Sequence, residues 1–206
     1  ASQSVVFEVS LMPLLRDVLG GLHVTALLFG EGNSGKEYTL FGSDFNDGVG
    51  RGLCPRAVEW LLSELKLEIE RKTAKVMVSY IEVYKEDIYD LVNGGKLCKK
   101  GVSERDSRQG PYVEEAKAQS VTCQKDVEEL IVRATEYRKA TEEKGEAKRS
   151  HGILDILVHR ELKDSEKAGA GVFTEGVLRF GVLAGGESPE RRDKEIEVEK
   201  KEETKL

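Results

Sequence analysis

The amino-acid sequence predicts a single α/β domain in which helices and a central sheet form three layers. A short apolar run at residues 24–29 is followed by a glycine-rich turn and then by helix-forming residues. Further along, runs rich in Val, Ile and Tyr alternate with segments whose apolar residues recur at helical spacing. The 206 residues are enough for one domain with a proper core, and 39% of them are apolar.

The N-terminal third is expected to contribute one strand and three helices, one of them directly after the glycine-rich turn. Residues 7–18 carry apolar side chains at helical spacing, and Pro13 within that pattern predicts a kink or a later helix start. Gly20–Gly21 provides a stop. The run at 24–29 fits a strand buried on both faces of a sheet, and Pro55 opens a helix with one apolar face.

The rest of the chain is expected to add three strands and two helices. Residues 75–84 read as a long strand, and residues 153–158 and 177–183 read as two more. A short helix is expected after the first of these strands, closed by Asn93-Gly94-Gly95. Apolar residues at helical spacing in 127–134 predict a second, amphipathic helix.

The composition of the chain limits its possible partners and its cellular compartment. The net charge of −6 favours neither nucleic acid nor an anionic membrane as a partner. No apolar run is long enough to span a bilayer, and three scattered cysteines favour a reducing compartment, so we expect a cytoplasmic protein. The last 20 residues hold 14 charged ones. We therefore expect a folded domain over residues 1–186 and a disordered or solvated tail over 187–206.

The apolar run at 24–29 leads into a motif for phosphate binding. Gly30, Gly35 and Lys36 have the spacing of a loop whose backbone N–H groups curl around an anion while a lysine adds a full charge. The next position normally carries the Ser or Thr hydroxyl that holds Mg²⁺, whereas this chain has Glu37. The predicted nucleotide-binding residues are Gly30, Glu31, Gly32, Asn33, Ser34, Gly35, Lys36, Glu37 and Tyr38.

Further segments, in the same order along the chain, extend this motif into a family resemblance. They are Phe29-Gly30, Glu37–Gly42, Gly52–Ala57, Val78–Leu91, Tyr112–Glu114, Arg149–His151 and Leu183–Gly185. Over residues 3–187 the chain resembles the kinesin motor domain. This resemblance implies a P-loop NTPase fold with a central mixed sheet, ATP or ADP with Mg²⁺ as cofactor, microtubules as partner and a cytoskeletal location. The family's first strand and its last helices, which make most of the microtubule contact, are expected to be missing from this chain.

The two segments that resemble the family's switches depart from its pattern. In the first, Lys144–His151, the positions of two serines are taken by Ala147 and Lys148. In the second, Val182 stands where the family has an aspartate that organises the water around the metal. Arg149 and Glu187 keep the family positions that close the site around the attacking water. They are the expected catalytic residues if the site is active, and we expect them to form a salt bridge.

Glu37 is the one candidate metal ligand, because a carboxylate can bind Mg²⁺. Without the metal it would repel a phosphate by about 3–4 kcal/mol, for charges roughly 5 Å apart at an effective dielectric constant of about 20. Asn33 also replaces a family glycine, although Asn tolerates the left-handed conformation better than most residues.

Three functional hypotheses follow. The first is a kinesin-like pseudo-motor that binds ATP weakly at most, is hydrolysis-deficient, and acts through microtubules or another protein partner. The second is a functional microtubule-dependent ATPase whose terminal segments lie outside this chain. The third, an unrelated P-loop enzyme such as a small-molecule kinase, leaves the Val78–Leu91 segment unexplained.

Overall fold

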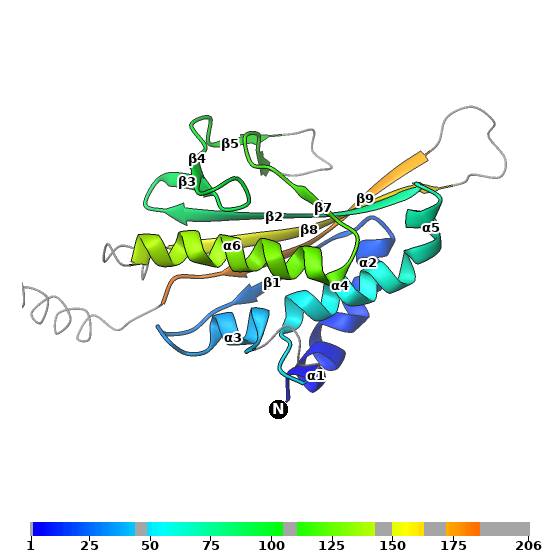
Figure 1. Cartoon of the computed structure of the whole chain (residues 1–206), viewed down its shortest axis with the longest axis horizontal. Coiled ribbons are helices and arrows are strands. Elements are labelled where there is room, and N and C mark those ends of the chain that lie inside the picture. The colour runs from blue at the N-terminus through cyan, green and yellow to red at the C-terminus, as the bar shows by residue number, and fades with distance from the viewer. Residues whose placement is uncertain (1, 44–48, 105–110, 143–149, 163–171, 186–206) are drawn as a thin grey trace, which may run out of the picture.

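A central mixed sheet organises the computed structural model, which describes residues 2–43, 49–104, 111–142, 150–162 and 172–185 (Figure 1). The sheet has seven strands in the order β1-β9-β8-β2-β3-β4, with β7 also paired to β2. In chain order they are β1 (His23–Leu28), β2 (Ala74–Tyr84), β3 (Asp87–Asp90), β4 (Lys96–Leu97), β7 (Gln119–Val121), β8 (His151–Leu162) and β9 (Val172–Val182). Strand β1 pairs with β9 in parallel and the other pairings are antiparallel, which confirms the predicted mixed sheet.

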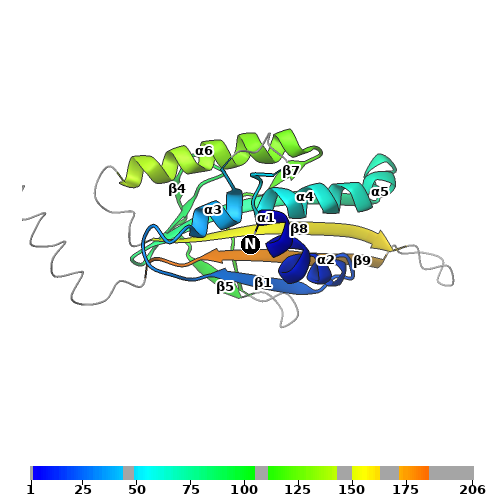
Figure 2. The same ribbon diagram turned by 90° about the horizontal axis from the view of Figure 1, so that it is seen from below.

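The described helices pack on one face of this sheet (Figure 2). They are α1 (Gln3–Val6), the π-helical segment η1 (Phe7–Leu11), α2 (Met12–Leu19), α3 (Lys36–Phe41), α4 (Leu53–Glu64), α5 (Lys66–Glu70) and α6 (Gln124–Glu142). On the other side of the sheet lies a small two-stranded sheet made of β5 (Val102–Glu104) and β6 (Pro111–Val113). The predicted α/β class is confirmed, and within the described ranges its helical layer covers a single face.

The core follows the two-residue period of the strands. Side chains at even-numbered positions of β2, β8 and β9 point toward the helices and are buried. They are Val76, Val78, Tyr80, Leu154, Ile156, Val158, Leu178, Phe180 and Val182. Leu15 and Val18 of α2, Leu61 of α4, and Leu130 and Ile131 of α6 complete the same cluster. The predicted strands at 75–84, 153–158 and 177–183 and the helix at 127–134 are therefore confirmed, and the last three extend beyond the predicted ranges.

Two polar side-chain pairs cross between β8 and β9 on the helix-free face. Arg179 donates to both carboxylate oxygens of Asp155, at 2.8 and 2.7 Å. Further along the same two strands, His159 Nε2 lies 3.3 Å from a carboxylate oxygen of Glu175. Both pairs join residues that are directly opposite each other in the register, so this face carries cross-strand polar contacts where the other carries the core.

The prediction that residues 24–29 are buried on both faces is wrong. Strand β1 lies at the edge of the sheet, and its residues alternate between exposed and partly buried. Leu27 is 66% exposed, and Phe29, just beyond the strand, is 79% exposed. The apolar run therefore has only one covered face, because the described helices pack on the other side of the sheet from Leu27.

The short helix expected after residue 84 is also wrong, because this segment forms strand β3 of a tight hairpin. Tyr84 is opposite Asp87, and Lys85 adopts the left-handed conformation, with φ 54°, that the turn needs. Pairing with β2 buries Ile88 in a small cluster with Ile81 and Cys98, a tertiary contact that outweighs the local helical preference.

Of the two outcomes predicted for Pro13, a kink or a later helix start, the later start is wrong. The helix begins at Gln3, passes through the π-helical segment η1, and continues as α2 with Pro13 in its first turn. A proline lacks the N–H that an α-helical bond would use, and its ring crowds the preceding turn. The wider π-helical turn lies directly before it.

Some predictions fall outside the described ranges, including the charged tail at 187–206. Among the described helices none is both long and apolar enough to cross a membrane.

Candidate functional site

The predicted phosphate-binding loop connects β1 to α3, so residues 29–35 lie between a strand and a helix as expected. Gly35 precedes α3 in a left-handed conformation, with φ 90° and ψ 18°. Its carbonyl accepts hydrogen bonds from the backbone N–H and the hydroxyl of Thr39, at 2.8 and 3.0 Å. Asn33 is also left-handed, with φ 57°, which is the conformation expected where the family has a glycine. The backbone of the loop thus tolerates this replacement.

Lys36 is bonded within the loop itself. Its ammonium donates to the carbonyl oxygens of Gly30 and Glu31, at 3.0 and 2.7 Å. The Lys36 ammonium thus links the first residues of the loop to the start of α3. A phosphate group that used the Lys36 ammonium would have to replace these two bonds.

Helix α3 is held in place by two contacts of its own residues with other elements. The buried side chain of Gln3 donates to the carbonyl of Tyr38 at 2.7 Å and ties α3 to the N-terminal helix. At the other end of α3, the Phe41 ring meets Tyr80 of β2 edge to face, with centroids 6.0 Å apart. Glu37 precedes both anchored residues, and these two contacts fix the helix that carries it.

Glu37 forms an ion pair with Arg138 of α6. The distance from Glu37 Oε1 to Arg138 Nη1 is 2.9 Å. The two partners differ in exposure, since the Glu37 side chain is 54% exposed and that of Arg138 only 8%. The carboxylate that replaces the metal-binding hydroxyl is thus directed at a nearly buried guanidinium.

Arg138 is the centre of a buried polar network. Its Nε lies 3.2 Å from Glu82 Oε1, and its Nη1 also donates to the Tyr80 hydroxyl oxygen at 2.9 Å. The Ser150 hydroxyl donates to the same Glu82 oxygen at 2.6 Å and accepts from Arg138 Nη2 at 3.4 Å. The network therefore connects α3, β2, α6 and the start of β8.

The protonation states in this network follow from burial and charge. Burial raises the pKa of Tyr80 to about 12, so the phenol is neutral at physiological pH. Burial by itself lowers the pKa of Arg138, but Tyr80 and the carboxylates of Glu37 and Glu82 raise it by more, and the net pKa lies above its ordinary value. Arg138 is thus a permanent cation.

The described side chains do not fit a magnesium ion. Mg²⁺ requires oxygen ligands in nearly octahedral geometry, but Glu37 is paired with Arg138 and the Ser150 hydroxyl is bonded inside the network. Val182, at the end of β9, is buried and apolar. Within the described residues no group of three or more His, Cys, Asp or Glu side chains could hold a metal ion.

His151, the last residue of the first switch segment, is bonded to the second switch segment. Its Nδ1 accepts a hydrogen bond from the backbone N–H of Ala184 at 3.1 Å. The other switch residues singled out from the sequence, Ala147, Lys148, Arg149 and Glu187, lie outside the described residues. The expected Arg149–Glu187 salt bridge therefore stays a prediction.

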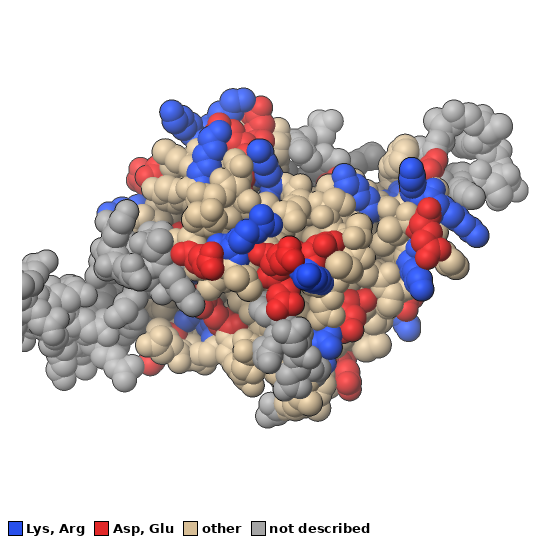
Figure 3. All heavy atoms as spheres, in the orientation of Figure 1, with Lys and Arg blue, Asp and Glu red and all other residues tan. Residues whose placement is uncertain are grey.

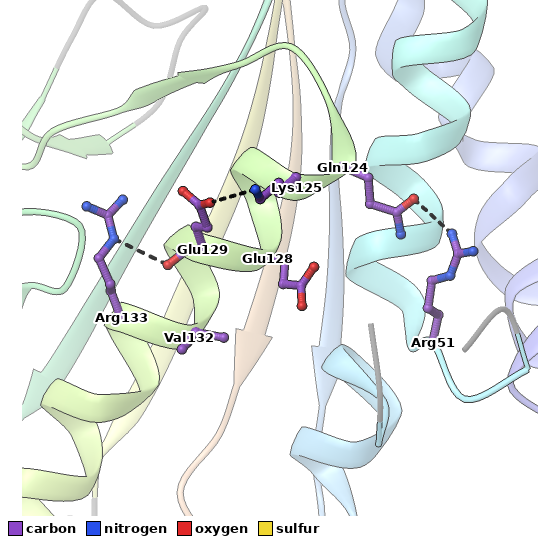
Figure 4. A pocket seen from close by; sticks show the side chains of 7 residues that line it. All are labelled: Arg51, Gln124, Lys125, Glu128, Glu129, Val132 and Arg133. Atoms are coloured by element: carbon purple, nitrogen blue, oxygen red, sulfur yellow. Dashed lines mark hydrogen bonds and ion pairs between the residues drawn. The ribbon is translucent and has the colours of Figure 1, made fainter. Parts of the chain in front are cut away.

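A separate surface pocket of about 840 Å³ lies beside the N-terminal half of α6 (Figure 4). It is lined by Arg51, Gln124, Lys125, Glu128, Glu129, Val132 and Arg133. Arg51 crosses to α6 by donating to Gln124 at 2.9 Å, and it also pairs with Glu59 at 2.7 Å. Acidic and basic side chains are interspersed over the face of the molecule drawn in Figure 3, and the pocket shares this mixed charge.

Comparison with known proteins gives a consistent family. The model of the kinesin motor domain matches residues 1–206. The chain is 32% identical over 171 residues to a kinesin heavy chain of Neurospora crassa and 28% identical over 193 residues to kinesin-related protein 13 of Dictyostelium discoideum. These alignments cover 82% and 92% of this chain but only 18% and 15% of the relatives.

A solved structure has the same fold. It is that of a fast kinesin, described in terms of its ATPase mechanism and its interactions with microtubules. It matches 92% of this chain with a TM-score of 0.79 and 29% identity. The chain spans 52% of that structure, so it corresponds to about half of the solved domain.

Proposed function

Because the chain belongs to the kinesin motor domain family, we propose that it is a pseudo-motor, a kinesin-like module that associates with microtubules or another cytoskeletal protein but does not hydrolyse ATP at a motor's rate. Its place of action is the cytoplasm, on the cytoskeleton. The observation that carries this proposal is the Glu37–Arg138 ion pair, at the position where the metal-binding hydroxyl is expected.

Hydrolysis of ATP requires positioned phosphates, a divalent metal and a placed water. In this chain the residue beside the loop lysine is a paired carboxylate, and the position of the metal-organising aspartate is the buried Val182. Removing a single preorganised stabilising group from an enzyme costs about 10²–10³ in rate. Two such changes in one site are enough to abolish useful turnover.

The charges around the loop support weak nucleotide binding. Lys36 and Arg138 contribute two positive charges, and Glu37 and Glu82 contribute two negative ones, so these four side chains offer no net attraction to a phosphate. Lys36 would also have to leave the two loop carbonyls that it binds. ATP or ADP is therefore a weak ligand of this loop, held by Lys36 and the backbone N–H groups of residues 30–36.

The test is ATP turnover by the purified chain, with and without microtubules, combined with microtubule co-sedimentation. We expect turnover to stay at background in both conditions and the protein to sediment with microtubules or with a cytoskeletal partner. A microtubule-stimulated rate of about 1 s⁻¹ or more, at the lower end of typical enzyme rates, contradicts the proposal.

The preserved loop geometry favours a second candidate, an active microtubule-dependent ATPase whose terminal segments lie outside this chain. The strand–loop–helix arrangement and the left-handed Gly35 are both present. In that case Arg149 and Glu187 would be catalytic. The turnover assay separates the two candidates, because only the second predicts stimulation by microtubules.

A further inference from the structure

We infer that the Glu37–Arg138 ion pair keeps Mg²⁺ out of the phosphate-binding loop, so that a nucleotide bound there is held without a metal. This inference rests on the proposed role of residues 30–36 in binding phosphate groups. It concerns what the loop can bind, whereas the proposed function concerns whether the chain hydrolyses ATP.

Arg138 is a fixed cation. Its guanidinium is anchored from inside the protein by Glu82 and by the Tyr80 hydroxyl, at 3.2 and 2.9 Å. With 8% of its side chain exposed, it cannot turn into solvent without leaving the Glu82 carboxylate buried and unpaired. The partner that can move is Glu37, which is 54% exposed.

The fixed cation decides what Glu37 can bind. A Mg²⁺ ion on the Glu37 carboxylate would lie close to the Arg138 guanidinium, and the two positive charges would repel each other. The guanidinium already compensates the carboxylate at 2.9 Å, so a metal would gain little from the same oxygen. The Arg138 guanidinium therefore binds the Glu37 carboxylate where a metal ion would otherwise bind it.

The described residues around the loop offer no second site for the ion. The Ser150 hydroxyl donates to Glu82 and accepts from Arg138, which directs it into the network. Val182 presents a buried apolar side chain where an acid would be needed. A metal entering beside the loop would thus find no ligand in these described side chains and would face a nearby cation.

The test measures the dissociation constant of ATP by calorimetry, once in excess EDTA and once in excess MgCl₂. For the wild-type chain we expect ATP to bind more weakly in MgCl₂ than in EDTA, because Mg²⁺ in solution competes with the loop for the nucleotide. Glu37→Thr removes the ion pair and supplies the missing hydroxyl. For this variant we expect ATP to bind at least about tenfold more tightly with Mg²⁺ than without it, a free-energy change of about 1.4 kcal/mol.

The matched control is Glu70→Thr, the same substitution at an exposed carboxylate of α5. It changes the net charge of the chain equally and should leave the ratio of the two constants at the wild-type value. The wild-type chain and both variants are checked by circular dichroism and thermal unfolding. Because Glu37 lies on the exposed side of the pair, its replacement is expected to leave the fold intact.

Two results would overturn the inference. One is wild-type ATP binding that is as strong in MgCl₂ as in EDTA, or stronger. The other is a folded Glu37→Thr variant whose ATP binding is no stronger with Mg²⁺ than with EDTA, including no binding in either condition. Hydrolysis by a wild-type chain whose ATP binding is weaker in MgCl₂ than in EDTA would instead contradict the proposed function and leave this inference standing.

Discussion

His151 at the start of β8 accepts a hydrogen bond from the backbone N–H of Ala184, two residues beyond the end of β9, over 3.1 Å. The bond joins the last residue of the first switch segment to the second switch segment. It involves a side chain and a backbone group, and it needs no nucleotide. His151 therefore has a structural role in holding these two segments together.

Replacing His151 with alanine should lower the free energy of unfolding by about 0.5–1.5 kcal/mol, the usual net value of one hydrogen bond. The lower half of that range is expected because His151 is exposed. Urea unfolding at neutral pH measures the change. His23→Ala, at an exposed position of β1, is the comparison and should have a smaller effect. Equal stabilities of wild type and His151→Ala would show that the bond contributes nothing.

Replacing Arg138 with methionine should be far more damaging, with a loss of about 3–5 kcal/mol. The reason is that Glu82 would remain buried without a cation. Glu37→Ala, which removes the exposed partner of the same guanidinium, should cost less than about 1 kcal/mol. Chemical denaturation of both variants tests this asymmetry. It would be refuted if the two losses were similar.

The three cysteines should differ in their reactivity toward a thiol reagent such as dithionitrobenzoate. Cys123 is exposed, whereas Cys54 and Cys98 are buried. Burial raises the pKa of Cys54 to about 12 and also raises that of Cys98, so few of these thiols are ionised near neutral pH. One thiol per chain should react quickly in the native protein, and all three after denaturation. Cys123→Ser should abolish the fast phase.

Asp126 should stabilise helix α6 in a pH-dependent way. One of its carboxylate oxygens accepts hydrogen bonds from the backbone N–H groups of Thr122 and Cys123, at 2.7 and 3.1 Å. Its pKa is lowered, first of all by the bond from the Thr122 N–H. The stabilisation is therefore fully present above the ordinary carboxyl pKa of 3.8 and is lost as the pH falls through the lower folded value.

For Asp126→Ala we expect a loss of about 0.5–2 kcal/mol at pH 7, which is typical of a helix cap. The difference between variant and wild type should shrink in acid, because protonation removes the same bonds from the wild type. Urea titrations at pH 7 and at about pH 3 measure it. A difference that stayed constant between these two pH values would mean that the charge of Asp126 does not matter.

The sequence was most informative where periodicity and burial coincide. Strands β2, β8 and β9 and helix α6 were predicted because their apolar residues recur at the spacing of the element that forms. Strand β3 was missed because its conformation depends on pairing with β2 and on the burial of Ile88, which no local pattern contains. The exposure of β1 was missed for a related reason, since strand composition does not reveal which strand lies at an edge.

The site was only partly foreseeable. The glycine spacing predicted the loop, and the unusual Glu37 was evident beside it. Its partner Arg138 was not found, because it lies 101 residues further along the chain. A signal was nevertheless present, since Glu82 follows Tyr80 at a core-facing position of a strand. A carboxylate at such a position requires a buried cation, and a search of neighbouring helices for an arginine would have followed from it.

The polar pairs on the helix-free face also help to set the register between β8 and β9. Moving β9 along β8 by four residues in one direction would place Asp155 opposite Glu175, and in the other direction His159 opposite Arg179. The first shift would bring two carboxylates together, and both shifts would break the Asp155–Arg179 ion pair, so the polar pairs disfavour these alignments. The retained alignment sets Gly152 opposite Val182. Four polar side chains of the two strands thereby favour the alignment in which the start of β8 and the end of β9 lie side by side. These are the strand ends next to the two switch segments.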